Sequence, residues 1–364
     1  MPVRLPSLEN IPGGSAFAAL SRRVRTLIIG GVLFVILFVV ALTMPVPYVI
    51  LSPGPTFNTL GVDDNGNKII MIMGKKPNVT TGNLNMTTVN VSTHSVSAFE
   101  AFVGWLEHDE VVVPRSAVYP PNKSTKQIDQ QNTADFAQSQ DSATVAALCE
   151  LKYPKQFGVF KVIDNGPSSG LLRAGDQLLA VAGQSVTSTT QLRAVLATHA
   201  PGTSVIVHIK RSGKILDVPV KLGTPQTTGV KGGFLGVSAD NTCLAPFNID
   251  LGLGNEIGGP SAGLMFALGI IDEVGTVDLT GGKFIAGTGT IDNTGKVGPI
   301  GGIALKMIAA RNKGATIFLA PQGNCDDVRG NVPSGLRVIS VSTLHEAVTD
   351  LEGIQNGTLN PAGC

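Results

Sequence analysis

Several kinds of functional motif are missing from this sequence of 364 residues. No G-x-x-x-x-G-K-[ST] pattern occurs, and none of its Gly-Lys pairs is followed by Ser or Thr, which argues against a P-loop nucleotide site. There is no C-x-x-C spacing, and the five histidines show no ligand spacing, so we predict no metal and no other cofactor. Lys and Arg number 27 against 26 Asp and Glu, so no charged field is available to attract nucleic acid.

Charge is also absent from one long segment near the N-terminus. Leu27–Met44 is an uncharged apolar run of the length needed to cross the hydrocarbon core of a bilayer, about 30 Å. Three arginines lie just before it at positions 22, 23 and 25, and the next basic residue is Lys68. The positive-inside rule therefore predicts a cytoplasmic segment at 1–26, a single-pass anchor in the cell membrane at 27–44, and an extracytoplasmic remainder.

Two alternatives compete with an anchor. A cleavable signal peptide has a shorter apolar run and an A-x-A-like site, which Ala41-Leu42-Thr43 matches poorly. A buried core helix is less favoured, because every face of the segment is apolar and the arginines cluster at one end. The pattern favours the anchor.

Cysteine is scarce, with four residues that all follow the predicted anchor: Cys149, Cys243, Cys325 and Cys364. Disulfides persist outside the cytoplasm, and four cysteines allow three pairings. We expect Cys243 to pair with Cys325, because both fall in the same predicted domain.

The segment 62–155 mixes strand-like and helix-like patterns and carries no chemical motif. Ile69–Met73 and Met86–Val91 are strand-like, whereas Ser97–Leu106 and Thr133–Leu148 are helix-like. We predict a mixed α/β region that partly belongs with the C-terminal domain.

A different pattern follows at 156–223, where strands flank a short helix over Thr190–Thr198. The stretch Ser168–Gly183, SSGLLRAGDQLLAVAG, resembles the signature of bacterial PDZ domains. PDZ domains bind an extended peptide as an added strand and hold its carboxylate with backbone amides. The resemblance places these functions on a loop at Gly158, Val159 and Phe160 and on an apolar groove that includes Leu192 and Leu196. The alternative is a simple strand-entry turn at Gly158 and two core leucines.

The most informative residues lie in the C-terminal third. Gly258-Gly259-Pro260-Ser261-Ala262-Gly263 is followed at once by an apolar run of helical length, so Ser261 is expected at or just before a helix N-terminus. The helix dipole and its unpaired amides favour a developing anion there. The glycines, Gly259 among them, let a substrate backbone approach closely.

A lone lysine lies about 45 residues further on. Lys306 is the sole charged residue between Lys296 and Arg311, and its neighbours at i−3, i+1 and i+2 are apolar. Such surroundings remove hydration and depress the pKa of an amine, which can then accept the proton of a nucleophilic serine.

Three motifs in order, GGPSAG, TGTI and GKVGPIGGIALK, resemble the proteolytic domain of the Lon family over residues 232–352. The resemblance implies Ser261 as nucleophile and Lys306 as base, with Thr288 of the TGTI motif in support. We expect backbone amides near Ser261 and Ala262 to stabilise the oxyanion. A PDZ domain and a Lon-like domain behind one anchor resemble a bacterial subgroup of membrane-bound Lon-like proteases. The predicted fold is therefore a multidomain α/β (α+β) protein with a transmembrane helix, a PDZ domain and a Lon-type proteolytic domain.

Two departures from the Lon pattern affect the expected activity. Gly258 stands where Lon proteins commonly carry an acid, and the chain has no P-loop to couple proteolysis to ATP. We therefore expect ATP-independent cleavage of exported or membrane-associated peptides and proteins. Because Lon relatives assemble into rings, self-association is also expected.

Three other functions share some of these residues. Gly259–Gly263 satisfies the G-x-S-x-G pattern of α/β-hydrolases, which would need His345 as the base and a buried strand before the serine. His345-Glu346 begins an H-E-x-x-H motif, but Thr349 occupies its last position. A catalytically silent PDZ/Lon-like scaffold that binds exported proteins is the alternative from another functional class.

Overall fold

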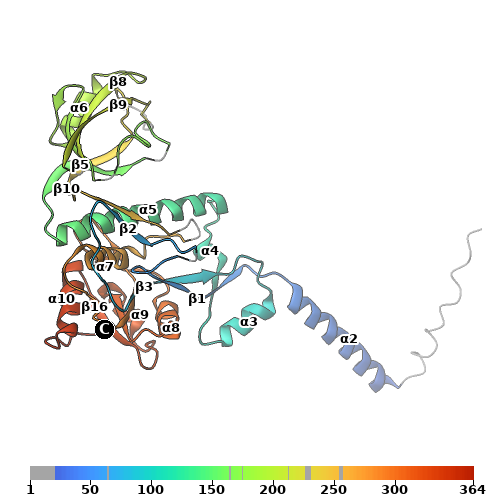
Figure 1. Ribbon diagram of the computed structural model, residues 1–364. Helices are drawn as coiled ribbons and strands as arrows, with labels where there is room; N and C mark the ends of the chain where they lie inside the picture. Colours follow the sequence, from blue (N-terminus) through green and yellow to red (C-terminus); the bar gives the residue numbers. More distant parts are fainter. Residues whose placement is uncertain are drawn as a thin grey trace, which may run out of the picture. The chain divides into compact units, whose positions relative to one another are not determined.

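The computed structural model describes residues 21–63, 65–163, 165–173, 175–211, 213–225, 231–253 and 257–364 (Figure 1). Most of the predicted cytoplasmic segment therefore lies outside the described residues. The chain forms two compact units. The first contains residues up to Leu51 together with Val91–Pro120, and the second contains Ser52–Asn90 and Pro121–Cys364.

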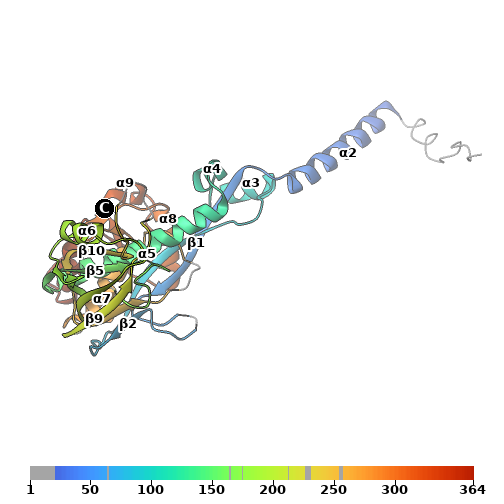
Figure 2. The ribbon, with the colours of Figure 1, turned by 90° about the horizontal axis from the view of Figure 1, so that it is seen from above.

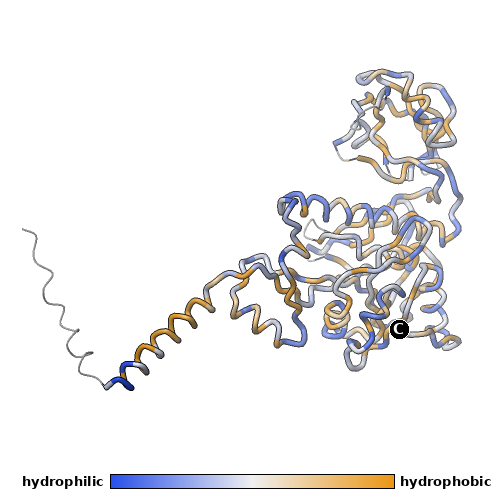
Figure 3. The backbone as a smooth tube through the Cα atoms, turned by 180° about the vertical axis from the view of Figure 1, so that it is seen from behind, coloured by the Kyte–Doolittle hydropathy of each residue, from blue (hydrophilic) through white to orange (hydrophobic). Residues whose placement is uncertain are grey.

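Helix α2, Arg22–Thr43, dominates the first unit. The Ser21 side chain caps it by accepting a hydrogen bond from the Val24 N–H, and none of its residues is buried. Figure 3 shows its apolar colouring along nearly its whole length. By length and composition α2 can cross a membrane, and a signal sequence passes the same test.

The rest of the first unit is a small α/β layer. The start of strand β1 (Tyr48–Asn58) pairs antiparallel with β4 (Val111–Pro114), which runs into the short helix α4 (Arg115–Val118). Helix α3 (Ala98–Leu106) begins with a capping box, in which Ser97 and Glu100 satisfy each other's backbone N–H groups.

In the second unit, one sheet has the strand order β16-β15-β12-β3-β1. Strands β3, β12, β15 and β16 are parallel neighbours, as expected for strands connected through helices. Their bounds are Asn83–Val91 for β3, Phe284–Gly287 for β12, Ile317–Pro321 for β15 and Arg337–Val341 for β16.

Helix α7 (Gly263–Val274) lies in the core, and all of its residues are buried. Its run Leu264–Ile271 is apolar on every face, which explains this position. The buried carboxylates of Asp272 and Glu273 near its end accept hydrogen bonds from the Leu279 N–H and from Lys68 Nζ.

The long helix α5 (Thr125–Glu150) packs beside α7, with Phe136 and Phe266 in edge-to-face contact at 5.8 Å between ring centroids (Figure 2). These two helices, far apart in sequence, form a common layer behind the segment that carries Ser261.

Smaller elements complete this part of the second unit. They are β2 (Ile70–Met73), which pairs with β11 (Asn248–Leu251), β13 (Thr290–Ile291), which pairs with β14 (Val297–Gly298), and the helices α8 (Ile303–Lys313), η1 (Gln322–Asn324), α9 (Cys325–Val328) and α10 (Leu344–Gln355).

A second sheet with the order β10-β5-β6-β8-β9 has its own apolar core. Its strands are β5 (Lys155–Val162), β6 (Gln177–Val181), β8 (Ser204–Arg211), β9 (Lys214–Lys221) and β10 (Val237–Cys243), with β7 (Gln184–Ser185) beside β6 and helix α6 at Thr189–Ala197. Strand β10 pairs with β5 along its whole length. This sheet therefore extends past residue 223 and includes residues that the sequence analysis placed in the C-terminal domain.

The predicted disulfide is wrong. Cys243 is bonded to Cys149, which joins the end of β10 to the end of α5. Cys325 is bonded to Cys364 instead. Because β10 belongs to the second sheet and α5 ends beside it, Cys149 is the close partner of Cys243.

Candidate active site

Ser261 lies in a turn immediately before α7. The first helical residue is Gly263 and Ala262 is the N-cap, so the Ser261 side chain is not used as a helix cap. Gly259, at φ +85°, has the left-handed backbone that this turn requires and that favours glycine. Ser261 is therefore presented on a loop whose shape is set by the residues around it.

Helix α5 fixes this loop from one side. The Ser139 hydroxyl donates to the Pro260 carbonyl at 2.8 Å, and the Gly259 N–H donates to the Asn132 carbonyl at 2.9 Å. The contact is close, since a Cβ added at Gly263 would lie 2.7 Å from the Ser139 oxygen. Both residues that precede Ser261 are thus tied to one helix.

Lys306 reaches the same point from the first turn of α8. Gly302, with φ +70°, is the N-cap of that helix, and the Asn324 side chain binds both backbone groups of Ile300 just before it. Lys306 Nζ lies 2.8 Å from Ser261 Oγ and 3.0 Å from Thr288 Oγ1. A conformation fixed at the start of α8 therefore directs the amine to the serine.

The environment of Lys306 changes its acid–base behaviour. The residue is only 3% exposed, and desolvation lowers the pKa of its ammonium to about 8. Burial disfavours the charged form of an amine, so a neutral amine becomes available near physiological pH. A neutral amine can accept a proton from a hydroxyl at this distance.

Thr288 follows the end of β12 and completes a cluster of three polar side chains. It is fully buried, and its hydroxyl donates to the Ser261 carbonyl at 3.0 Å while accepting from Lys306. The Gly289 N–H donates to the same carbonyl at 2.8 Å. Thr288 therefore contacts both Lys306 and the backbone of Ser261.

A cleft of about 680 Å³ opens onto this cluster. Gly259, Ser261, Ala262 and Lys306 line it together with Met86–Asn90 of β3. Strand β12 covers β3 only from Asn83 to Met86, so beyond Met86 the β12-facing edge of β3 has no strand partner among the described residues. The N–H groups of Ser261 and Ala262 also have no hydrogen-bond partner in that part of the chain.

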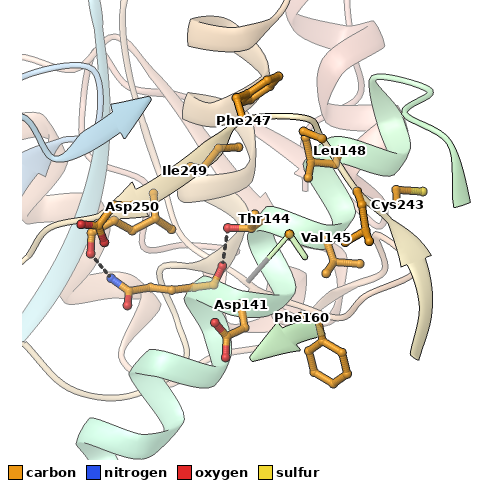
Figure 4. A pocket seen from close by; sticks show the side chains of 14 residues that line it. Asp141, Thr144, Val145, Leu148, Phe160, Cys243, Phe247, Ile249 and Asp250 are labelled. Carbon is orange, nitrogen blue, oxygen red and sulfur yellow. Dashed lines mark hydrogen bonds between the residues drawn. The ribbon is translucent and has the colours of Figure 1, made fainter. Parts of the chain in front are cut away.

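A separate cavity of about 220 Å³ lies elsewhere in this unit (Figure 4). It is bounded by Asp141, Thr144 and Leu148 of α5, by Phe160 of β5, and by the segment around Phe247. Neither Ser261 nor Lys306 lines it.

Two residues predicted to hold a peptide carboxylate do not lie in a groove. Gly158 and Val159 are on β5, which lies between β10 and β6, and Val159 is fully buried. Both edges of β5 are occupied, so it cannot accept an added strand at this point. This part of the sequence interpretation is corrected.

A hollow of about 910 Å³ is present instead between α6 and β10. Leu192 and Leu196 line it, as does Phe160, together with Gly233-Phe234-Leu235. Strand β10 is at the edge of the sheet, and Gly232 and Gly236, with φ +90° and +79°, flank this loop in the left-handed region. The GGFLG run at 232–236 was the sequence signal for this loop, and the sequence analysis did not use it.

Comparison with known proteins finds two families in the chain. Residues 134–222 match the family model of the PDZ domain, and residues 255–352 match that of the Lon protease C-terminal proteolytic domain. The fold and the site thus define a PDZ domain joined to a Lon-type proteolytic domain. This chain carries both, and the Lon-type domain supports a serine protease.

Individual relatives match about a quarter of this chain. Lon protease 2 of Bacillus subtilis is 33% identical over 98 residues, which cover 27% of this chain and 17% of the relative. The Lon protease of Rhizobium meliloti is 36% identical over 93 residues, covering 25% and 11%. The chain thus matches under a fifth of the length of either relative.

Among solved structures, the PDZ domain of an SdrC-like protein from Listeria monocytogenes is 21% identical and covers 23% of this chain and 87% of its own, with a TM-score of 0.22. That score is too low to support an argument about function.

Proposed function

We propose that this protein is an ATP-independent serine endopeptidase in which Ser261 is the nucleophile and Lys306 the general base. The observation that carries the proposal is the distance of 2.8 Å between Lys306 Nζ and Ser261 Oγ, at a lysine whose pKa is lowered to about 8. A Ser-Lys pair of this kind is a recognised variant of nucleophilic catalysis.

In the proposed reaction Lys306 acts first as a base and then as an acid, both when the acyl ester forms and when it is hydrolysed. Neutral Lys306 takes the proton of the Ser261 hydroxyl while Oγ attacks the scissile carbonyl carbon. The ammonium then protonates the leaving amine as the peptide bond breaks, which leaves an acyl ester on Ser261. Water attacks this ester, Lys306 accepts its proton, and the proton returns to Ser261 Oγ when the acid product leaves.

Two features of the cleft support binding of an extended peptide. The edge of β3 beyond Met86 offers backbone groups to an added strand beside Ser261. The N–H groups of Ser261 and Ala262, at the start of α7, are suited to hold the oxyanion of the tetrahedral intermediate.

We also propose where the protein lies in the cell and how it recruits its substrates. We place α2 in the cell membrane as a single-pass anchor, with the N-terminus in the cytoplasm and the proteolytic domain outside it. The substrates are exported or membrane-associated peptides and proteins. The hollow between α6 and β10 provides the PDZ surface for their segments, with the loop at Gly232–Gly236 near the peptide end.

The test is hydrolysis of an unfolded protein substrate by the purified full chain in detergent, without ATP. Wild type is compared with Ser261→Ala, Lys306→Ala and His345→Ala. We expect the first two changes to abolish cleavage and the third to leave it intact. His345 is a suitable control because its ring is exposed and Nδ1 lies 2.8 Å from Glu150 Oε1.

Other outcomes would redirect the assignment. Activity that depends on His345 and survives in Lys306→Ala would overturn the dyad in favour of a hydrolase triad. A wild-type protein that cleaves nothing over a panel of unfolded and membrane-associated substrates would favour the binding scaffold.

A further inference from the structure

Helix α3 in the first unit presents large apolar side chains to solvent. Phe99 is 43% exposed, Phe102 56%, Trp105 73% and Leu106 56%. At about 100° per residue these four positions fall within an arc of about 120° on one side of the helix. Exposed apolar surface gathered on one face marks an interaction site more often than scattered single residues do.

The opposite side of α3 is already packed. Gly104 is buried, and a Cβ added there would lie 3.3 Å from Val112 and 3.4 Å from Ile50. These two residues belong to the paired strands β4 and β1. The helix therefore cannot roll its aromatic face inward without losing this contact, and the exposure of that face is a fixed feature of the unit.

Backbone hydrogen bonds tie the start of α3 to the end of α2. The Ala98 N–H donates to the Met44 carbonyl at 3.1 Å, and the Val46 N–H donates to the Val96 carbonyl at 2.9 Å. Met44 is the C-cap of α2. The aromatic helix thus begins at the level where the apolar helix ends.

We propose that α3 lies at the membrane–water interface on the non-cytoplasmic side, with Phe99, Phe102, Trp105 and Leu106 in contact with lipid. The proposal rests on the membrane anchorage of α2 proposed above. Trp is enriched at this depth because its ring is amphipathic, and Phe and Leu form the buried apolar face of helices that lie in the interface. The face would give the first unit a second membrane contact in addition to the spanning helix.

The composition of α3 defines the kind of lipid contact. It contains no Lys or Arg, and its one charged residue is Glu100, which forms the capping box. Attachment therefore depends on apolar burial and on the covalent link to α2, with little contribution from anionic headgroups. We expect the contact to form in neutral phosphatidylcholine vesicles and to resist added salt.

The chain contains a single tryptophan, so Trp105 reports on this face without a label. The full chain is reconstituted into phosphatidylcholine vesicles in which a fraction of the lipid carries bromine on its acyl chains. We expect bromine near the headgroup to quench Trp105 emission more than bromine near the chain end. We also expect a blue-shifted emission maximum and poor quenching by aqueous iodide.

Two variants sharpen the measurement. Phe99→Ser combined with Phe102→Ser should weaken quenching by brominated lipid and increase quenching by iodide. The matched control is Val332→Ser, an exposed apolar residue outside this unit, which should change neither.

Each contrary result has a separate meaning. Strong iodide quenching without lipid quenching would overturn the proposal. Protection from both quenchers would also overturn it, in favour of a contact between protein chains. Carbonate extraction is followed in parallel: release of the protein from the vesicles would overturn the anchorage of α2 and this proposal with it, whereas retention with an iodide-accessible Trp105 would overturn this proposal alone.

Discussion

Burial of Lys306 sets the pH range in which the proposed dyad can work. Its pKa, lowered to about 8, leaves about a tenth of the lysine neutral at pH 7 and most of it neutral above about pH 9. Because the neutral amine is the base, kcat/KM should rise with pH, reach half its maximum near pH 8 and level off above about pH 9. The measurement is a pH profile of peptide cleavage at low substrate concentration. A profile that is flat from about pH 6 to about pH 9 would contradict the assignment of Lys306 as the base.

Thr288 touches both Lys306 and the carbonyl of Ser261, so its hydroxyl should matter more than its volume. Thr288→Val keeps the shape but removes the donor to Ser261 and the acceptor for Lys306. We expect kcat to fall by about 10- to 100-fold, because one partner that positions the base is lost. Thr288→Ser should recover most of the rate.

The matched control for this change is Thr316→Val. The Thr316 hydroxyl, just before β15, donates a hydrogen bond to the Phe284 carbonyl. Thr316 does not line the cleft. Equal losses of activity in both valine variants, or no rescue by serine, would show that Thr288 acts through folding instead of through the dyad.

At the scale of elements, α5 is the helix that holds the loop of the proposed nucleophile, Ser261. Ser139→Ala removes the hydrogen bond to Pro260 and should loosen the loop that presents Ser261. We expect kcat to fall by about 3- to 10-fold with KM nearly unchanged, because orientation is affected more than binding. Steady-state kinetics at several substrate concentrations separate the two parameters.

Ser142→Ala is a close control on the same helix. Ser142 is also buried, but its hydroxyl accepts a hydrogen bond from Gln138 of the same helix. This variant should keep the wild-type kcat and show a similar melting temperature to Ser139→Ala. A similar fall in kcat in both would mean that α5 matters only for stability.

The sequence predicted some of these elements well. The helix over α3, the strands β8 and β9 and the helix α6 follow from hydrophobic period and turn residues, which are local signals. The start of α7 follows in the same way, because its apolar run begins directly after the glycine-rich turn. Local patterns therefore located Ser261 relative to α7.

Contacts between segments that are distant in the sequence could not be predicted from local sequence patterns. Gly158 looked like a carboxylate-binding loop because nothing in the sequence indicates that β10, some 80 residues later, pairs along β5. The part played by Ser139 and Asn132 was missed for the same reason, since α5 precedes Ser261 by more than 100 residues and carries no motif. Strand order and long-range packing, which local patterns do not encode, decide both cases.

Considered as a whole, the second unit contains the PDZ sheet as an insertion. Strand β3 precedes that sheet in sequence, and yet it lines one cleft with Ser261 and Lys306, which follow the sheet. Helix α5 also precedes the sheet, and it packs against α7 and bonds the loop before Ser261. All residues predicted from the sequence to form the catalytic site lie within 232–352. In the structure, β3 and α5, which precede the PDZ sheet in sequence, also lie next to the Ser261 loop.

The disulfide between Cys149 and Cys243 closes this insertion, since it joins the segment that enters the PDZ sheet to the segment that leaves it. A closed loop of 94 residues restricts the unfolded chain by about 4 to 5 kcal/mol in the chain-entropy model. Cys149→Ser combined with Cys243→Ser should therefore lower the melting temperature of the oxidised protein clearly.

The second disulfide provides the comparison. Its sequence separation is 39, so Cys325→Ser with Cys364→Ser should cost somewhat less, about 4 kcal/mol. Thermal unfolding of both double variants, with and without reductant, measures the difference. In reductant, the melting temperature of the wild type should fall to that of a variant with all four cysteines replaced by serine. Peptide mapping without reduction checks the pairing itself. A peptide that links Cys243 to Cys325 would contradict the arrangement, because β10 could not then pair along β5 and end beside α5.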